Sequence, residues 1–143
     1  MSYVWDTDIW IKYKPPKNLG GYFVSSVVLH ELVAGAADDS QIQLFELIRI
    51  QANHDDKLLT PTMIDWWEAG KILYRLRQGK KSRAKGITPK LPTAEVQRIM
   101  RDTMIARTIK RANATLVTDN IKDFERIRNF CDVKIISGSD YFA

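Results

Sequence analysis

The chain has 143 residues, a length that predicts a single domain over residues 1–143 with room for its own core. Hydrophobic residues make up 45% and charged residues 27%, which are globular proportions and exclude a chain that is mainly disordered. A single cysteine and two histidines exclude an internal disulfide and a zinc cluster. The net charge of +5 favours encounter with polyanions such as nucleic acids.

The sequence also predicts that the protein does not enter a membrane. Its longest stretch without Asp, Glu, Lys or Arg runs from Asn18 to His30, and this is shorter than the roughly 20 apolar residues that span a bilayer. The first ten residues contain Asp6 and Asp8 and no basic residue, which is unlike a signal peptide. We therefore expect a cytoplasmic location.

The first 36 residues alternate between predicted strands and helices. The apolar run 3–5 predicts a buried strand, and residues 9–14 a short helix that ends at two consecutive prolines. Residues 22–26 predict a second strand, and residues 27–35 a helix that begins after Ser25 or Ser26 as its cap.

Helices and strands also alternate in the rest of the chain. The segment LLT at 58–60 is too short to assign, and in the helix over 62–77 we expect Ile64, Trp67 and either Leu73 or Leu76 to point inward. The alternation predicts an α/β protein with a parallel sheet covered on both faces. The predicted helices are 40–53, 62–77, 93–111 and 122–128, and the predicted strands are 114–118 and 133–137.

Two predicted helices carry an acidic residue within an apolar stripe. Asp102 is in line with Ile99, Ala106 and Ile109, and Glu31 interrupts the stripe of the helix over 27–35. Because an isolated buried carboxylate is costly, such groups are expected to be paired, protonated or bound to a cation. The alternative is an acid at the boundary of the core that reaches water or a lysine.

Further acids follow the predicted strands. Asp6 comes after the first strand, while Asp119 and Asp123 follow the strand over 114–118. Each has an ordinary structural role open to it, as a helix cap or an acid in a first helical turn. Since ligand sites in open parallel sheets lie at the carboxyl ends of the strands, about four carboxylates would meet there. Oxygen ligands without His or Cys suit Mg²⁺ or Mn²⁺, which points to metal-assisted phosphodiester hydrolysis.

Several segments in order along the chain carry a resemblance to a known family. They are DTDIWI, SSVVLHELVAG, LLTPTMIDWWEAGKILYRLRQGK, DTMIARTIKRANATLVT and TDNIKDF. The chain resembles the PIN domains, and most closely the toxins of the VapC type. The resemblance implies an α/β/α sandwich around a central parallel sheet and a ribonuclease that depends on Mg²⁺ or Mn²⁺. It also implies a homodimer and a cognate antitoxin protein that inhibits it.

The resemblance also assigns residues to a site. Asp6, Glu31 and Asp102 match the acids of the family, with Asp123 as the fourth catalytic and metal-binding acid and Asp119 as a reserve. The polar residues Thr118 and Asn120 match a supporting pair. Asp8 departs from the family, which commonly has Asn at this position, and it adds negative charge beside the expected metal.

The remaining basic and aromatic residues allow two interpretations. The loop between the helices over 62–77 and 93–111 either contacts RNA phosphates or is a solvated connector; its basic residues are Lys80, Lys81, Arg83, Lys85 and Lys90. The same two interpretations apply to the basic residues of the helix over 93–111, and its solvent face is the simpler one; they are Arg98, Arg101, Arg107, Lys110 and Arg111. The tryptophans are expected in the core or in an interface, with base stacking as the alternative; they are Trp5, Trp10, Trp66 and Trp67.

Two other functions remain open at this stage. One is a PIN-like module that binds RNA or a protein without cleaving, and the other is a nuclease of RNA processing or repair with no antitoxin. The set of acids favours cleavage over simple binding, because binding a polyanion alone would favour fewer of them.

Overall fold

The structure, a computed structural model, describes residues 2–14, 22–79 and 92–143. Its strands are parallel. β1 (Tyr3–Trp5), β4 (Thr115–Val117) and β5 (Lys134–Ile136) form one sheet in the order β1-β4-β5. β2 (Val24–Ser25) pairs with β3 (Leu58–Leu59), and a single bridge from Val4 to Phe23 joins this pair to β1. The segment that was too short to assign is thus an edge strand.

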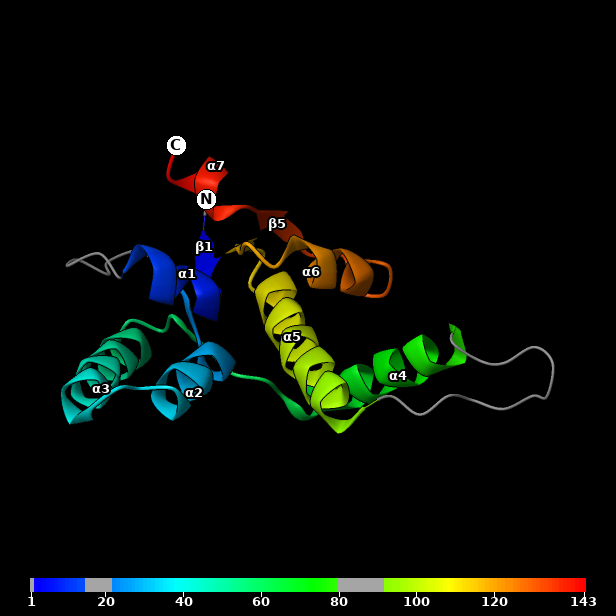
Figure 1. Cartoon of the computed structure of the whole chain (residues 1–143), viewed down its shortest axis with the longest axis horizontal. Helices are drawn as coiled ribbons and strands as arrows, with labels where there is room; N and C mark the ends of the chain where they lie inside the picture. The colour runs from blue at the N-terminus through cyan, green and yellow to red at the C-terminus, as the bar shows by residue number, and fades with distance from the viewer. Residues whose placement is uncertain (1, 15–21, 80–91) are drawn as a thin grey trace.

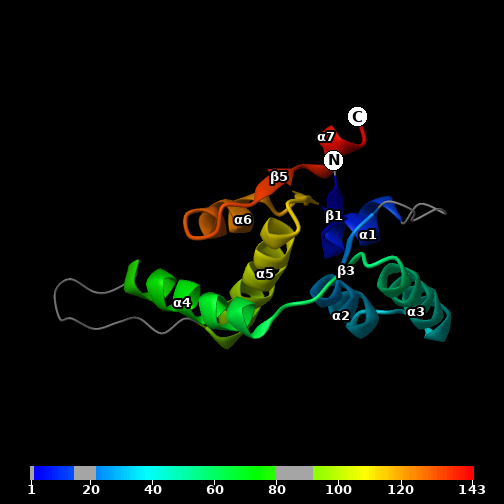
Figure 2. The same ribbon diagram turned by 180° about the vertical axis from the view of Figure 1, so that it is seen from behind.

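Helices surround these strands as the alternation predicts. In Figures 1 and 2, α1 and α3 lie on one side of β1 and α4, α5 and α6 lie on the other, with α2 below β1 between α3 and α5. The predicted α/β fold with a parallel sheet between helices is confirmed. The helices are α1 (Thr7–Tyr13), α2 (Ser26–Ala34), α3 (Asp39–His54), α4 (Met63–Gly79), α5 (Thr93–Arg111), α6 (Ile121–Arg128) and α7 (Gly138–Tyr141).

The core lies where α5 and α6 meet the strands. Val4 of β1 and Leu116 of β4 are fully buried, and Ile105, Ile109 and Phe124 pack in the same cluster. Eight residues of α5 are buried, so this helix supplies the largest share of the core among the helices described. No helix in the described ranges is long and apolar enough to cross a bilayer.

The register of the strands brings the residues that follow them to one edge. Trp5 lies opposite Val117, which in turn lies opposite Ile136. The pairing continues one step further, since the amide of Asp6 donates to the Val117 carbonyl at 2.9 Å and the amide of Thr118 donates to the Ile136 carbonyl at 3.0 Å. The candidate site residues after β1 and β4 are therefore neighbours.

Helix α4 departs from the prediction. Ile64 and Trp67, expected to point inward, are 61% and 63% exposed. The buried positions are instead Asp65, Ala69 and Ile72. The reason is an ion-pair cluster on α5, which draws an acidic residue to the inner face and turns the apolar residues beside it outward.

Asp65 joins α4 to α5 through hydrogen bonds on both carboxylate oxygens. Its Oδ1 accepts from Nε of Arg107 at 3.1 Å, and its Oδ2 accepts from the guanidinium of Arg111 and from the amide of Thr62 at 2.8 Å. Thr62 Oγ1 in return accepts from the Asp65 amide at 3.3 Å, which completes a capping box at the start of α4. Arg107 and Arg111 therefore fasten two helices instead of lying free on a solvent face.

We expect Asp65→Ala to lower the free energy of unfolding by about 2 kcal/mol, since it removes a helix cap and a buried partner of two arginines. Urea denaturation measures this. Glu68→Ala is the matched control, because the pair of Glu68 with Lys71 lies at the surface of the same helix and such pairs contribute about 0.5 kcal/mol or less. Equal losses in the two variants would contradict the role given to Asp65.

Candidate active site

Asp6 is fixed at the end of β1 by two hydrogen bonds. Its Oδ1 accepts from the amide of Thr7 at 2.8 Å, which caps α1, and its Oδ2 accepts from Thr118 Oγ1 at 2.8 Å. Thr118 Oγ1 also accepts from the amide of Asn120 at 3.0 Å. The cap expected as an alternative role is therefore present, and the buried Thr118 hydroxyl orients the same carboxylate toward the strand ends.

Asp102 lies on the buried face of α5, as its stripe predicts, and is 8% exposed. Its Oδ2 is buried and has no hydrogen-bond partner among the described residues. Burial, together with the nearby carboxylates of Asp6, Asp123 and Glu31, raises the pKa of Asp102 to about 8. The three acids that act on Asp102 come from three other segments, so the fold brings the four predicted residues into one electrostatic group.

The other acids of this group are also perturbed. Burial raises the pKa of Asp6 to about 6; the Thr118 hydrogen bond opposes the rise, and the charges of Asp8 and Glu31 add to it. Burial likewise raises the pKa of Glu31, against the effect of the Arg101 guanidinium. Acids whose pKa is raised both by burial and by one another's charge mark a site that is short of positive charge.

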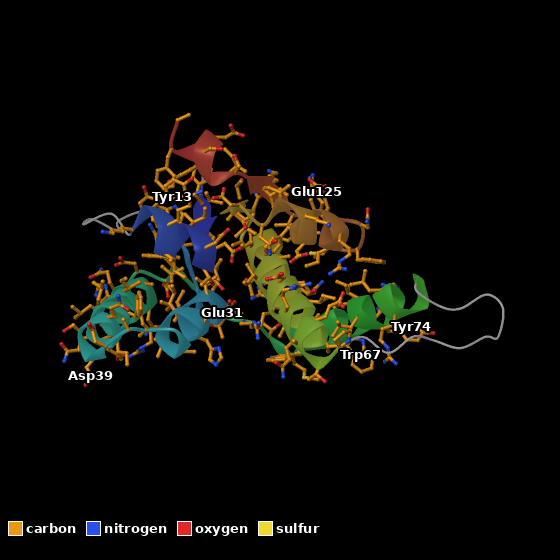
Figure 3. All side chains as sticks on the ribbon, in the orientation of Figure 1. Tyr13, Glu31, Asp39, Trp67, Tyr74 and Glu125 are labelled. Atoms are coloured by element: carbon orange, nitrogen blue, oxygen red, sulfur yellow. The ribbon has the colours of Figure 1, made fainter. Side chains whose placement is uncertain are left out.

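Glu31 and Asp123 stand at the rim, each beside an arginine of α5. Figure 3 shows Glu31 on α2 in the space between α2 and α5. Its Oε1 lies 4.0 Å from Nε of Arg101. Asp123, in the first turn of α6, accepts from Asn120 Nδ2 at 3.1 Å and lies 3.4 Å from Nε of Arg98.

Sequence reasoning missed Arg98 and Arg101, which it assigned to the solvent face of the helix. Both guanidinium groups instead reach the rim acids, although each side chain remains partly exposed. The spacing along the helix could have indicated this position, because Arg98 precedes Asp102 by one helical turn and Arg101 is the residue next to Asp102. A helix that presents an acid to the site also presents basic residues at its border.

Asp119 has other partners. The interpretation of Asp119 as the cap of α6 is wrong, because Asn120 occupies the cap position and makes no side-chain cap bond. Asp119 Oδ1 accepts from the amide of Gly138 at 2.8 Å, and its Oδ2 pairs with Lys12 at 3.3 Å. The side chain thus ties the segment after β4 to α1 and α7, while Asp123 is the acid whose charge acts on Asp102.

Asp8 is a structural neighbour of the site. Its Oδ2 accepts from the backbone amide of Asp119 at 3.0 Å, so it links the first turn of α1 to the segment after β4. Burial raises the pKa of Asp8 as well. The departure from the family at this position therefore adds a carboxylate whose charge acts on Asp6 and Glu31.

The oxygen atoms of these acids are the candidate ligands for a divalent cation. Among the residues described, no three or more His, Cys, Asp and Glu side chains already form a group that could hold a metal ion. The outer acids, Asp123 and Glu31, pair with Arg98 and Arg101. The unpartnered buried oxygen of Asp102 and the all-oxygen chemistry nevertheless suit Mg²⁺ or Mn²⁺.

The basic loop falls outside the described residues. This applies to all five of its predicted RNA contacts, namely Lys80, Lys81, Arg83, Lys85 and Lys90.

Comparison with solved structures identifies the fold. VapBC-1 from nontypeable Haemophilus influenzae matches with a TM-score of 0.58 at 20% identity, over 96% of this chain and 98% of that chain. The chain has the PIN-like fold of the VapC toxins. DNA-bound VapBC from Salmonella typhimurium matches with a TM-score of 0.57 at 22% identity, again over 96% and 98%. VapBC2 from Rickettsia felis, bound to a promoter DNA fragment, gives 0.56 at 22% identity and the same coverage.

These identities are low, and the likeness establishes the VapC-like fold alone. No family model matches the chain, and no curated protein matches it by sequence.

The burial of Asp102 among other acids predicts how the stability of the protein depends on pH. Asp102 in the folded protein has a pKa of about 8 against an ordinary value of 3.8, so the folded state retains a proton that the unfolded state has lost. Without metal, the free energy of unfolding therefore falls as pH rises from about 4 to about 8. Asp102→Asn removes this loss, and denaturation in EDTA should find the variant more stable than the parent at pH 8.

At pH 8 the free energy of unfolding of Asp102→Asn should exceed that of the parent by more than about 1 kcal/mol, because one pKa unit corresponds to about 1.4 kcal/mol. This difference should shrink at pH 5. Glu125→Gln is the control, since Glu125 lies on the outer face of α6 (Figure 3) and forms an exposed ion pair with Arg128 of the same helix. A variant of Asp102 that is less stable than the parent at pH 8 would contradict the proposed repulsion.

Proposed function

We propose that the protein is an endoribonuclease that depends on Mg²⁺ or Mn²⁺ and acts as the toxin of a toxin-antitoxin pair. One observation carries the proposal: the buried carboxylate of Asp102, whose Oδ2 has no hydrogen-bond partner among the described residues, lies among the charges of Asp6, Glu31 and Asp123 at the strand ends. A protein gains no stability from such a group by itself. A bound cation would neutralise these carboxylates and so account for their arrangement.

Asp6, Glu31, Asp102 and Asp123 would hold the cation. When bound, it supplies Lewis acidity toward a phosphate and activates the attacking water for in-line displacement. Thr118 orients Asp6, and the Asn120 side chain orients Asp123, so the polar pair acts through the acids. Because Asp102 is largely protonated at pH 7, metal binding would release a proton and strengthen as the pH approaches 8.

The two rim arginines complete the site. In the structure Arg98 and Arg101 lie beside the acids of α6 and α2. With a cation between the acids, these guanidinium groups would be available to phosphates of the substrate, which they bind through paired hydrogen bonds. The site would then attract a polyanion despite its carboxylates.

The proposed partner is an antitoxin protein. The compared structures are VapBC complexes, two of which hold DNA, and the fold of this chain supports a toxin of that kind. A homodimer is part of the same proposal. The alternatives are a nuclease without an antitoxin and a module that binds RNA without cleaving it.

Incubation of the purified chain with total cellular RNA and Mg²⁺ tests the activity. We expect discrete fragments that disappear with EDTA and with Asp102→Asn, whose amide lowers the charge available to the cation by one unit. Gel or sequencing readout of the fragment ends measures this. Binding of RNA with no fragments in the parent would favour the non-cleaving module.

Expression in cells separates the two nuclease candidates. A toxin should slow growth, Asp102→Asn should restore it, and a co-expressed cognate partner should also restore it. Harmless expression of an active nuclease would favour the processing or repair enzyme.

A second comparison separates the two acids after β4. Asp123→Asn should reduce cleavage at limiting Mg²⁺ at least about tenfold, since it removes a charged oxygen donor from the group around Asp102. Asp119→Asn should leave cleavage near the parental level, because the amide oxygen can still accept from Gly138. Metal titrations of the cleavage rate measure both, and the reverse pattern would exchange the two roles.

A further inference from the structure

A pocket of about 580 Å³ lies beside the carboxylate site. Its walls come from α2, from the segment between β3 and α4, from α4 and from α5. The lining is mostly apolar, with Met100, Met104 and the ring of Trp66, and polar atoms are contributed by His30, Gln97 and Arg101. Pockets of this size with few polar groups bind small flat ligands or parts of larger ones.

Two pairs of consecutive residues connect this pocket to the acids. His30 lines the pocket and Glu31 belongs to the acid group on α2, while Arg101 lines the pocket and Asp102 belongs to the acid group on α5. Consecutive residues on a helix point about 100° apart, so each helix offers one face to the pocket and the adjacent face to the acids. The pair of Arg101 with Glu31 at 4.0 Å forms the border.

Trp66 lines the pocket but is not part of the hydrophobic core. It is 51% exposed, although it lies in a wall of a pocket and not on a flat surface. Trp5 and Trp10, by contrast, are buried and pack edge to face against each other. Trp66 and Arg101 line the same pocket, and unpaired bases stack on aromatic rings and on arginine planes.

We propose that this pocket binds a nucleobase of single-stranded RNA, next to the phosphate that the carboxylate site would cleave. Trp66 stacks on the base, His30 and Gln97 offer hydrogen bonds to its edge, and Arg101 contacts the phosphate between the base and the acids. The inference rests on the proposed function for its choice of polymer. It adds a specificity subsite, formed by residues outside the acid group.

The chemistry of the border favours RNA over a protein segment as the occupant. An apolar side chain of a partner could fill the same volume, but it would offer no partner to the Arg101 guanidinium, whose ion pair with Glu31 is long at 4.0 Å. A nucleotide satisfies both parts of the site, because its base is flat and apolar on its faces and its phosphate is anionic. The net charge of +5 favours the same class of ligand.

RNA binding by variants in an Asp102→Asn background tests the subsite without cleavage. The probes are a short single-stranded RNA of mixed sequence and the same sugar-phosphate chain with abasic riboses, both fluorescein-labelled and measured by anisotropy with Mg²⁺. We expect Trp66→Ala to weaken binding of the RNA about tenfold and binding of the abasic chain hardly at all. Trp66→Phe, which keeps an aromatic ring, should retain most of the affinity.

Trp67→Ala is the matched control. Trp67 is the next residue on α4, is similarly exposed and does not line this pocket; Figure 3 shows it far from Glu31. We expect it to bind both probes like its parent. Because Trp66 is half exposed, the variants should fold, and thermal unfolding checks this.

Several results would overturn the subsite. One is an equal effect of Trp66→Ala on the binding of both probes, and another is no effect on the binding of the RNA. A third is that Trp66→Ala leaves RNA binding unchanged but abolishes self-association or binding to an inhibitor protein. The proposed function fails separately: a chain that binds RNA as described but never cleaves it keeps the subsite and loses the nuclease.

Discussion

The parallel pairing of β1 with β4 is the interaction on which the site depends. It joins residues that lie more than a hundred positions apart in the chain, and it ends with the Thr118 hydroxyl donating to the Asp6 carboxylate. A slip of one residue would turn Val4 and Leu116, both fully buried, to the opposite face. Burial of the strands therefore fixes the position of the acid, and the core and the site are set by the same register.

The second constraint is electrostatic. The protein carries an excess of basic residues, yet its strand ends collect acids that raise one another's pKa. Arg98 and Arg101 neutralise the rim, but no positive group in the described part of the chain pairs with Asp102. The lack of positive charge is thus confined to the surroundings of Asp102, where a small cation would have the greatest effect. The same arginines form the outer boundary that a phosphate would meet first.

Much of the fold follows from the sequence because short periodic segments determine it. Helix α5 begins and ends at the residues that its pattern predicts, and Asp102 lies on its buried face. The prediction failed for the first half of α4, where Ile64 and Trp67 are exposed and Asp65 is buried instead, while Leu76 packs against the core as expected. Two arginines more than forty residues away determine that choice, and no local pattern contains them.

The site was predictable to a similar degree. Acids that interrupt apolar stripes or follow strands were identified, since their cost is visible in sequence. Partners were harder to predict: the bond from Gly138 to Asp119 depends on α7, a helix with no periodic signal, and on a glycine whose Cβ would lie 2.7 Å from the Tyr13 ring. The roles of Arg98 and Arg101 required the relative placement of α2, α5 and α6.

The ion cluster at Asp65 has a consequence for how such a protein diversifies. Trp66 follows Asp65 directly, so the bonds that fasten α4 to α5 also determine where the indole ring stands. Substitutions at this junction can shift the pocket wall by small steps while the carboxylates, held by β1, β4 and α5, stay in place. If the pocket binds a base and the carboxylates support cleavage, as proposed, recognition and cleavage would evolve at different rates, because separate contacts hold the two parts of the chain.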